Sequence, residues 1–172
     1  MKDNIEKRLS YLFTGELFGL ITFIVVSFMI DYSFPTLHLF SLCSFWVSFL
    51  LLEFILLQGT FYWYVKRKRL RQEKTSITPV WIIYKLKTFK ILNGGLLLIG
   101  LIMFSVDIFN WYPKLPLRGL SVVGFVYIFA LLEHINYYYV QLSYDNIADI
   151  RHLLKSKRLK QSCMKKDLKR IS

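Results

Sequence analysis

The chain has 172 residues, of which 55% are hydrophobic, and it carries 23 basic and 11 acidic residues. Soluble domains are about 45–50% apolar, so this composition argues against an ordinary soluble fold. The net charge of +12 does not by itself indicate nucleic-acid binding, because the basic residues gather between apolar runs and no recognition motif accompanies them.

Four apolar runs are each close to the ~20 residues that a helix needs to cross the hydrocarbon core of a bilayer. Lipid offers backbone groups no hydrogen-bonding partner, so each run is predicted to be a helix. The predicted spans cover residues 10–30, 39–65, 91–109 and 120–142. Short connections that contain proline join the first span to the second and the third to the fourth, which favours two tandem hairpins. The prediction is an all-α integral membrane protein, with a four-helix bundle in residues 1–150 and a basic tail in residues 151–172.

The basic residues are abundant in alternate connections. Three precede the first span, nine lie between the second and third, and nine follow the fourth, whereas the other two connections carry none and two. Cytoplasmic loops of membrane proteins are enriched in lysine and arginine, so both termini are predicted to be cytoplasmic. The first span is too long for a signal peptide and no small-residue cleavage site follows it, which predicts a retained anchor.

The connection between the second and third spans is predicted to contain a further element. Residues 80–89 mix apolar and basic side chains after a capping segment, which predicts a short amphipathic helix in the inner interface. Lys85, Lys87 and Lys90 are expected to contact anionic lipid headgroups. The basic tail is expected to form a similar membrane-associated helix from Arg151 onward and to contact the same headgroups.

Two Leu-Leu-Glu segments, residues 51–53 and 131–133, lie 80 positions apart in the second and fourth spans. The same offset aligns Gly15 with Gly95, Tyr32 with Tyr112 and Tyr64 with Tyr144, which indicates a duplicated hairpin. Glu53 and Glu133 are each nine residues from the inner end of their span, or about 13 Å, which is close to the midplane. An acidic side chain at the centre of a membrane helix costs about 2.5–3.5 kcal/mol on insertion scales. Both glutamates are therefore predicted to face each other inside the bundle.

Other polar side chains lie near these glutamates. The predicted intramembrane polar core, a candidate binding site, consists of Glu53, Glu133, His134, Asn136, Tyr137 and Gln58. Glu16 is expected to snorkel to the interface or to pair with Arg8 rather than to join this core. Asp107 is expected to lie solvated in the outer interface.

Three interpretations of the polar core stay open. In the first, the acids hydrogen-bond across helices and fix the packing, at an average of about 0.6 kcal/mol for each bond. In the second, they exchange protons and couple ion binding to transport, with His134 as a relay. In the third, they ligate a metal or serve an enzyme, but adjacent Glu133 and His134 diverge by about 100° on a helix. No nucleophile elbow, phosphate-binding loop or Cys-x-x-Cys motif accompanies them.

The leading prediction is a non-enzymatic packing or interaction module without metal or cofactor. Its partner would be lipid, another membrane protein or a second copy of the chain. The alternative is a small proton- or cation-coupled transporter that uses Glu53 and Glu133, as a homo-oligomer because four helices enclose little cavity. Cys43 and Cys163 are predicted to lie on opposite sides of the membrane, so no disulfide is expected between them.

Residues 133–145, followed by the basic tail, resemble the end of small four-span membrane proteins of Gram-positive bacteria that are often labelled "general stress protein". The resemblance covers about the last quarter of the chain. It implies a bacterial plasma membrane and a stress context. It implies no activity, and no functional residue is carried over from it.

Overall fold

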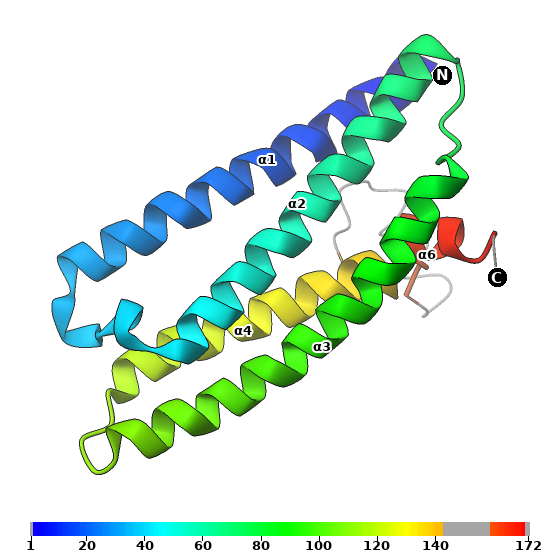
Figure 1. The fold of residues 1–172 in the computed structure, drawn as a ribbon. Coiled ribbons are helices and arrows are strands. Elements are labelled where there is room, and N and C mark those ends of the chain that lie inside the picture. The colour runs from blue at the N-terminus through cyan, green and yellow to red at the C-terminus, as the bar shows by residue number, and fades with distance from the viewer. Residues whose placement is uncertain (1, 143–158, 171–172) are drawn as a thin grey trace.

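The computed structural model describes residues 2–142 and 159–170 of the chain. In these residues four helices are long and apolar enough to cross a membrane, which confirms the prediction of an all-helical, multi-pass protein. The four helices lie side by side (Figure 1): α1 Lys2–Ser33, α2 Cys43–Gln72, α3 Val80–Trp111 and α4 Leu117–Tyr138. A short helix, α6 (Cys163–Leu168), lies at the end of the bundle that also carries the N-terminus.

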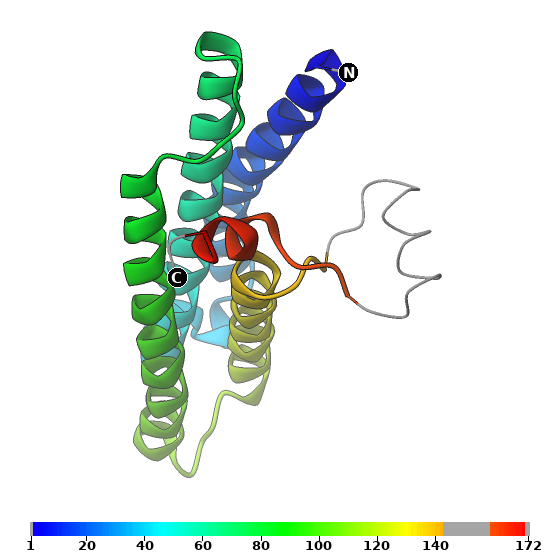
Figure 2. The same cartoon turned by 90° about the vertical axis from the view of Figure 1, so that its right-hand side faces the viewer.

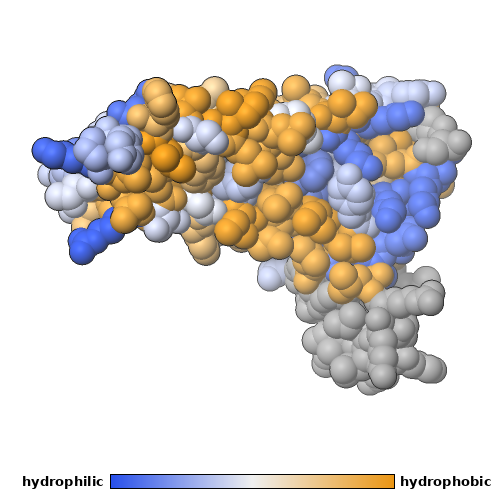
Figure 3. Space-filling model, turned by 90° about the horizontal axis from the view of Figure 1, so that it is seen from below, coloured by the Kyte–Doolittle hydropathy of each residue, from blue (hydrophilic) through white to orange (hydrophobic). Residues whose placement is uncertain are grey.

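The surface follows the hydropathy of the sequence. On the face shown in Figure 3, hydrophobic side chains cover the middle of the bundle and hydrophilic ones gather at its two ends. We call the end that contains Arg8, Lys66 and Lys166 the basic end. The described helices are therefore compatible with a protein that is embedded in a membrane through its middle.

Helix α2 is the centre of the bundle. Helices α1, α3 and α4 all pack along it, whereas α3 and α4 have much less contact with each other. In the most apolar part of each helix, 56% of the residues of α2 are buried but only 6% of those of α1. The buried face of α2 includes Leu51, Leu52 and Ile55, none of which is exposed. Helices α3 and α4 of the second hairpin therefore pack mainly against α2 and less against each other. Helix α1 lies at the periphery of the bundle (Figure 2).

The segment of residues 80–89 is helical but is not a separate element. It forms the first turns of α3, which begins at Val80 and continues without a break to Trp111. The exposed side chains of Lys85 and Lys87 lie on these turns, and Lys85 Nζ lies 5.2 Å from the ring centre of Trp81. An apolar sequence on both sides of residue 90 lets the helix continue, so the predicted boundary between interfacial helix and span is absent from the backbone.

The C-terminal segment packs against the basic end of the bundle. The helix predicted from Arg151 falls in residues 143–158, which lie outside the described residues, but the chain after them forms α6 between α3 and α4 (Figure 2). Ser162 begins α6: its hydroxyl oxygen accepts a hydrogen bond from the Lys165 backbone N–H at 3.1 Å. The same hydroxyl donates to the Tyr137 carbonyl at 2.5 Å, which joins α6 to the end of α4.

Asp167 holds α6 in place. Its carboxylate accepts hydrogen bonds from the Tyr62 hydroxyl at 2.7 Å and the Thr78 hydroxyl at 2.5 Å, and lies 3.0 Å from Lys66 Nζ. Burial opposes the ionisation of Asp167, but the hydrogen bonds from Thr78 and Tyr62 and the charge of Lys66 outweigh it and lower the pKa of this carboxyl. An ionised carboxylate with three donors is a strong anchor for so short a helix.

The prediction that Asp107 is solvated is wrong. Asp107 is 1% exposed, and its carboxylate accepts hydrogen bonds from the backbone N–H groups of Cys43 at 3.0 Å and Ser44 at 2.7 Å. The first N–H groups of a helix have no partner within the helix, so Asp107 of α3 caps α2 from a neighbouring helix. An aspartate near the end of an apolar run here serves packing rather than contact with water.

One glycine allows α2 and α4 to approach closely. A Cβ atom at Gly59 would collide with the ring and hydroxyl of Tyr137. Because Gly59 has no side chain, the Tyr137 ring lies directly against α2, where it is 4% exposed. This contact fixes the position of Tyr137 in the site described next.

Candidate functional site

Three buried polar side chains hydrogen-bond to each other between α2, α3 and α4. Gln58 Nε2 donates to Asn93 Oδ1 at 3.1 Å, and Asn93 Nδ2 donates back to Gln58 Oε1 at 3.0 Å. The Tyr138 hydroxyl donates to the same Gln58 oxygen at 2.6 Å. We call Gln58, Asn93 and Tyr138 the amide core. All three are at most 4% exposed, so these side chains hydrogen-bond to each other and are not available to water or a ligand.

The amide core also fixes the relative height of α2 and α4. Gln58 and Tyr138 are 80 positions apart, which is the offset that relates the two Leu-Leu-Glu segments. Glu53 and Glu133 each precede their member of this pair by five residues. Because both helices rise equally for each residue, the two glutamates lie at similar levels along the bundle.

Glu53 and Glu133 nevertheless do not share a hydrogen bond. Both carboxylate oxygens of Glu53 are buried without a hydrogen-bond partner among the described residues. One turn away on either side, Leu50 and Leu57 are 60% and 54% exposed, so Glu53 lies on the outward stripe of α2. Glu133 instead accepts a hydrogen bond from Asn136 Nδ2 at 3.2 Å on its own helix.

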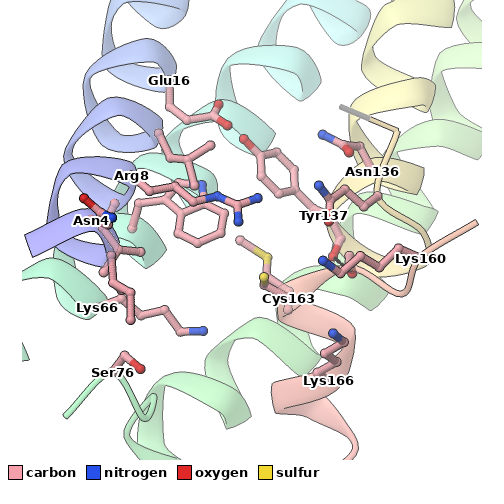
Figure 4. A pocket seen from close by; sticks show the side chains of 17 residues that line it. Asn4, Arg8, Glu16, Lys66, Ser76, Asn136, Tyr137, Lys160, Cys163 and Lys166 are labelled. Atoms are coloured by element: carbon pink, nitrogen blue, oxygen red, sulfur yellow. Dashed lines mark hydrogen bonds between the residues drawn. The ribbon is translucent and has the colours of Figure 1, made fainter. Parts of the chain in front are cut away.

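The acidic neighbour of Glu133 is Glu16 of α1. The two carboxyl groups interact electrostatically with each other, and both interact with the Tyr137 hydroxyl. Figure 4 shows the Tyr137 hydroxyl directed toward the Glu16 carboxylate. Glu16 therefore lies beside Glu133 and Tyr137 of the predicted polar core, to which it was not expected to belong. A side chain on α1 comes next to one on α4 only through packing between helices distant in the sequence.

His134 lies on the other side of α4. It is 5% exposed, its ring centre lies 5.1 Å from that of Tyr138, and its Nδ1 atom has no hydrogen-bond partner among the described residues. The six residues of the predicted polar core thus divide into separate groups. Gln58 belongs to the amide core with His134 beside it, Glu133, Asn136 and Tyr137 lie toward α1, and Glu53 is apart from both groups.

A cavity of about 480 Å³ opens at the basic end, between α1, α2, the end of α4 and the C-terminal segment (Figure 4). We call it the basic cavity. Its cationic lining consists of Arg8, Lys66, Lys160 and Lys166. Glu16, Asn136 and Tyr137 line it as well, so the group around Glu133 forms one wall. Apolar side chains complete the lining, among them Leu9, Leu12, Trp63 and Met164.

Sequence patterns did not reveal this cavity, because its cations come from segments far apart in the chain. Arg8 belongs to α1 and Lys66 to α2, while Lys160 and Lys166 follow the residues outside the described part. In the sequence, each of these residues belongs to a basic segment that is predicted to be cytoplasmic. The uneven charge distribution predicted that these basic residues lie at the same end of the bundle. It did not predict that they surround a cavity.

The described residues contain no group of three or more His, Cys, Asp or Glu side chains that could hold a metal ion. Cys43 and Cys163 are both exposed thiols and form no disulfide. Cys163 lines the basic cavity, whereas Cys43 lies at the start of α2 at the opposite end of the bundle.

No protein-family model, curated protein or solved structure matches the chain. The resemblance of residues 133–145 to general stress proteins therefore stays a prediction.

Proposed function

We propose that the protein is a non-enzymatic, membrane-embedded interaction module that holds another component of the membrane in its basic cavity. The α2–α3–α4 bundle, joined by the amide core, is the frame that keeps the cavity in shape. The proposal includes the plasma membrane of a bacterium as the location, with both termini in the cytoplasm. The distribution of basic residues supports that orientation.

A single contrast carries the proposal. The polar side chains of the amide core satisfy one another, whereas the Tyr137 hydroxyl in the wall of the basic cavity is buried beside the Glu16 carboxyl group without a hydrogen bond of ordinary geometry among the described residues. Buried polar groups in proteins nearly always have a partner, so an unpaired one at a cavity wall is expected to meet a ligand. Cationic and apolar side chains in one lining favour an amphipathic ligand.

Photo-crosslinking tests the proposal. A photoreactive residue is placed at Ile5, which lines the basic cavity and is 42% exposed, or at Leu117, which is 67% exposed at the opposite end. We expect one dominant adduct at position 5 after irradiation in native membranes, and the mixture of surrounding lipids at position 117. The same mixture at both positions, identified by mass spectrometry, would contradict a binding role for the cavity.

A second function, proton- or cation-coupled transport, is favoured by one observation. The Glu53 carboxylate oxygens are buried in the span without a hydrogen-bond partner among the described residues, as expected of a group that exchanges a proton or an ion. Reconstituted vesicles distinguish the two functions. If Glu53→Gln and Glu133→Gln abolish a proton-linked flux at unchanged unfolding temperature, the protein is a transporter. If they change only the thermal stability, the interaction module stands.

A further inference from the structure

We infer that the basic cavity binds the phosphate headgroup of an anionic phospholipid, whose acyl chains leave between α1 and α4. This inference rests on the proposed function, because it names the membrane component that the module would hold. It follows from the charge of the cavity, from its apolar wall and from one unpaired hydroxyl.

The charge of the lining favours a phosphate. Arg8, Lys66, Lys160 and Lys166 line the cavity, and Glu16 is the acidic residue among the lining residues. Lys66 is already 3.0 Å from Asp167, so its charge is partly neutralised. Among the described lining residues, four are cationic and one, Glu16, is acidic, and the cations come from three sides of the cavity (Figure 4). Guanidinium and ammonium groups form strong, charge-assisted hydrogen bonds with phosphate oxygens.

The apolar part of the lining favours a lipid over a free phosphate. Leu9 and Leu12 of α1 and Trp63 of α2 line the same cavity as the cations. A free phosphate ion would leave this apolar surface without a partner, whereas the glycerol and acyl groups of a phospholipid would cover it. Helix α1 packs along α2 and meets α4 through side chains, such as Phe23 and Phe129 with ring centres 5.3 Å apart, rather than through close backbone packing, and acyl chains would leave along this more loosely packed side.

Tyr137 supplies the third observation. Its side chain is 4% exposed and lines the cavity, and its hydroxyl lies beside the Glu16 carboxyl group without a hydrogen bond of ordinary geometry among the described residues. It points toward the end of the cavity marked by Glu16, away from Lys66 and Lys166 (Figure 4). In a phospholipid with its phosphate at the lysines, the ester carbonyls lie on the bilayer side of the phosphate. An ester carbonyl is an acceptor, so it would satisfy the Tyr137 hydroxyl.

Lipid titration of the full-length protein, followed by native mass spectrometry in a non-ionic detergent, tests the inference. The probes are phosphatidylglycerol, phosphatidylcholine and inorganic phosphate. We expect phosphatidylglycerol to bind roughly tenfold or more tightly than phosphatidylcholine, and inorganic phosphate at equal concentration not to displace it. The double variant Arg8→Gln/Lys166→Gln should weaken phosphatidylglycerol binding by about tenfold.

A matched control separates the cavity from general attraction to a basic surface. Lys85→Gln/Lys87→Gln removes the same charge from exposed positions on α3, outside the cavity lining. We expect this control to change phosphatidylglycerol binding less than about twofold, within the range of exposed charge pairs. Equal losses in the two double variants would overturn the inference. Displacement of the lipid by inorganic phosphate would also overturn it, in favour of a free anion site.

Tyr137→Phe tests the ester contact without a change in charge. We expect it to weaken the binding of ester-linked phosphatidylglycerol by about two- to tenfold and to leave an ether-linked analogue unaffected. Equal effects on both lipids would contradict a hydrogen bond from Tyr137 to the ester. If a dominant adduct forms from position 5 but no lipid is preferred in these titrations, the proposed function stands and the phospholipid inference fails.

Discussion

The amide core and the basic cavity differ in how their polar groups are satisfied. In the amide core, two amides and a phenol from three helices pair with each other, and none of them is more than 4% exposed. In the basic cavity, charged groups from α1, α2 and the C-terminal segment surround an open volume, and the Tyr137 hydroxyl in its wall has no partner among the described residues.

On this account, the amide core stabilises the bundle, whereas the basic cavity binds a ligand. A polar group in lipid needs a partner, and inside the bundle that partner comes from a neighbouring helix. At the basic end, polar groups from several segments surround the cavity instead, and the Tyr137 hydroxyl in its wall makes no hydrogen bond of ordinary geometry among the described residues. Variants of the core should therefore change stability and leave binding intact, while variants of the cavity should do the reverse.

The largest effect is expected where the two regions meet, at Gly59. Gly59→Val places atoms where the Tyr137 ring lies, so α2 and α4 must separate or Tyr137 must move into the cavity. Overpacking of this kind costs about 1–3 kcal/mol, and both the unfolding temperature and lipid binding should fall. Gly124→Val is the control, because a Cβ atom at Gly124 meets nothing within 4 Å. Unchanged stability in Gly59→Val, measured by thermal unfolding in detergent, would contradict the close contact.

The next effect concerns the core alone. Gln58→Leu removes a partner from both Asn93 and Tyr138 and should lower the free energy of unfolding by about 1–2 kcal/mol, with phosphatidylglycerol binding unchanged. Gln58→Leu/Asn93→Leu should recover part of this loss, because it removes the unpaired amide as well. Ser105→Ala, at an exposed position on α3, serves as the control. A double variant that is less stable than the single one would contradict the explanation that the unpaired Asn93 amide causes part of the loss.

A smaller loss of stability is expected at the end opposite the basic cavity. Asp107→Ala removes the acceptor for the first N–H groups of α2 and should cost about 1 kcal/mol, as the loss of a helix cap does. Asp31→Ala is the comparison, because Asp31 accepts one longer bond, from the Phe40 N–H at 3.3 Å. Thermal unfolding of both variants gives the ranking, and an equal or larger loss in Asp31→Ala would contradict the capping role.

The smallest global effect is expected from Asp167, which holds only α6. Because its folded pKa is lowered from 3.8, its stabilising contribution is complete above about pH 4 and is lost as the pH falls through the lower, folded value. Alkylation of Cys163, at the start of α6, should therefore accelerate below pH 3.8 after correction for thiol ionisation. Asp167→Asn should accelerate it at neutral pH with little change in unfolding temperature. An alkylation rate in Asp167→Asn equal to that of the unmodified protein would contradict the anchor.

The four spans could be predicted from the sequence because length and hydropathy determine them almost alone. The repeat offset of 80 also predicted the level of α2 against α4, since Gln58 bonds to Tyr138. The continuity of residues 80–89 with the third span was not predicted, because the basic residues of this segment indicated a separate interfacial helix, whereas the backbone forms one helix from Val80 to Trp111. The docking of α6 through Asp167 depends on residues about 90 and 105 positions away, Thr78 and Tyr62, which no local pattern connects.

The arrangement of the polar side chains was harder to predict than the fold. The depth of a glutamate follows from counting residues, but the direction of its side chain depends on which neighbour covers that side of the helix. Because α1 lies against α2 and leaves Glu16 beside Tyr137, Glu133 has its acidic neighbour on α1, and Glu53 remains on the outward stripe of α2. The signal in the sequence that could have indicated this arrangement was Glu16, an acidic residue within the apolar run of the first span.

The claim that the basic cavity is occupied while the opposite end of the bundle is not can be tested with the two natural thiols. Cys163 lines the cavity and Cys43 lies at the far end, and both are exposed. The full-length protein is treated with a membrane-permeant maleimide, with and without phosphatidylglycerol, and the alkylation of each thiol is followed by mass spectrometry. The account predicts that the lipid slows modification of Cys163 severalfold and leaves Cys43 unchanged. Equal rates at Cys163 with and without the lipid, or equal slowing at both thiols, would contradict it.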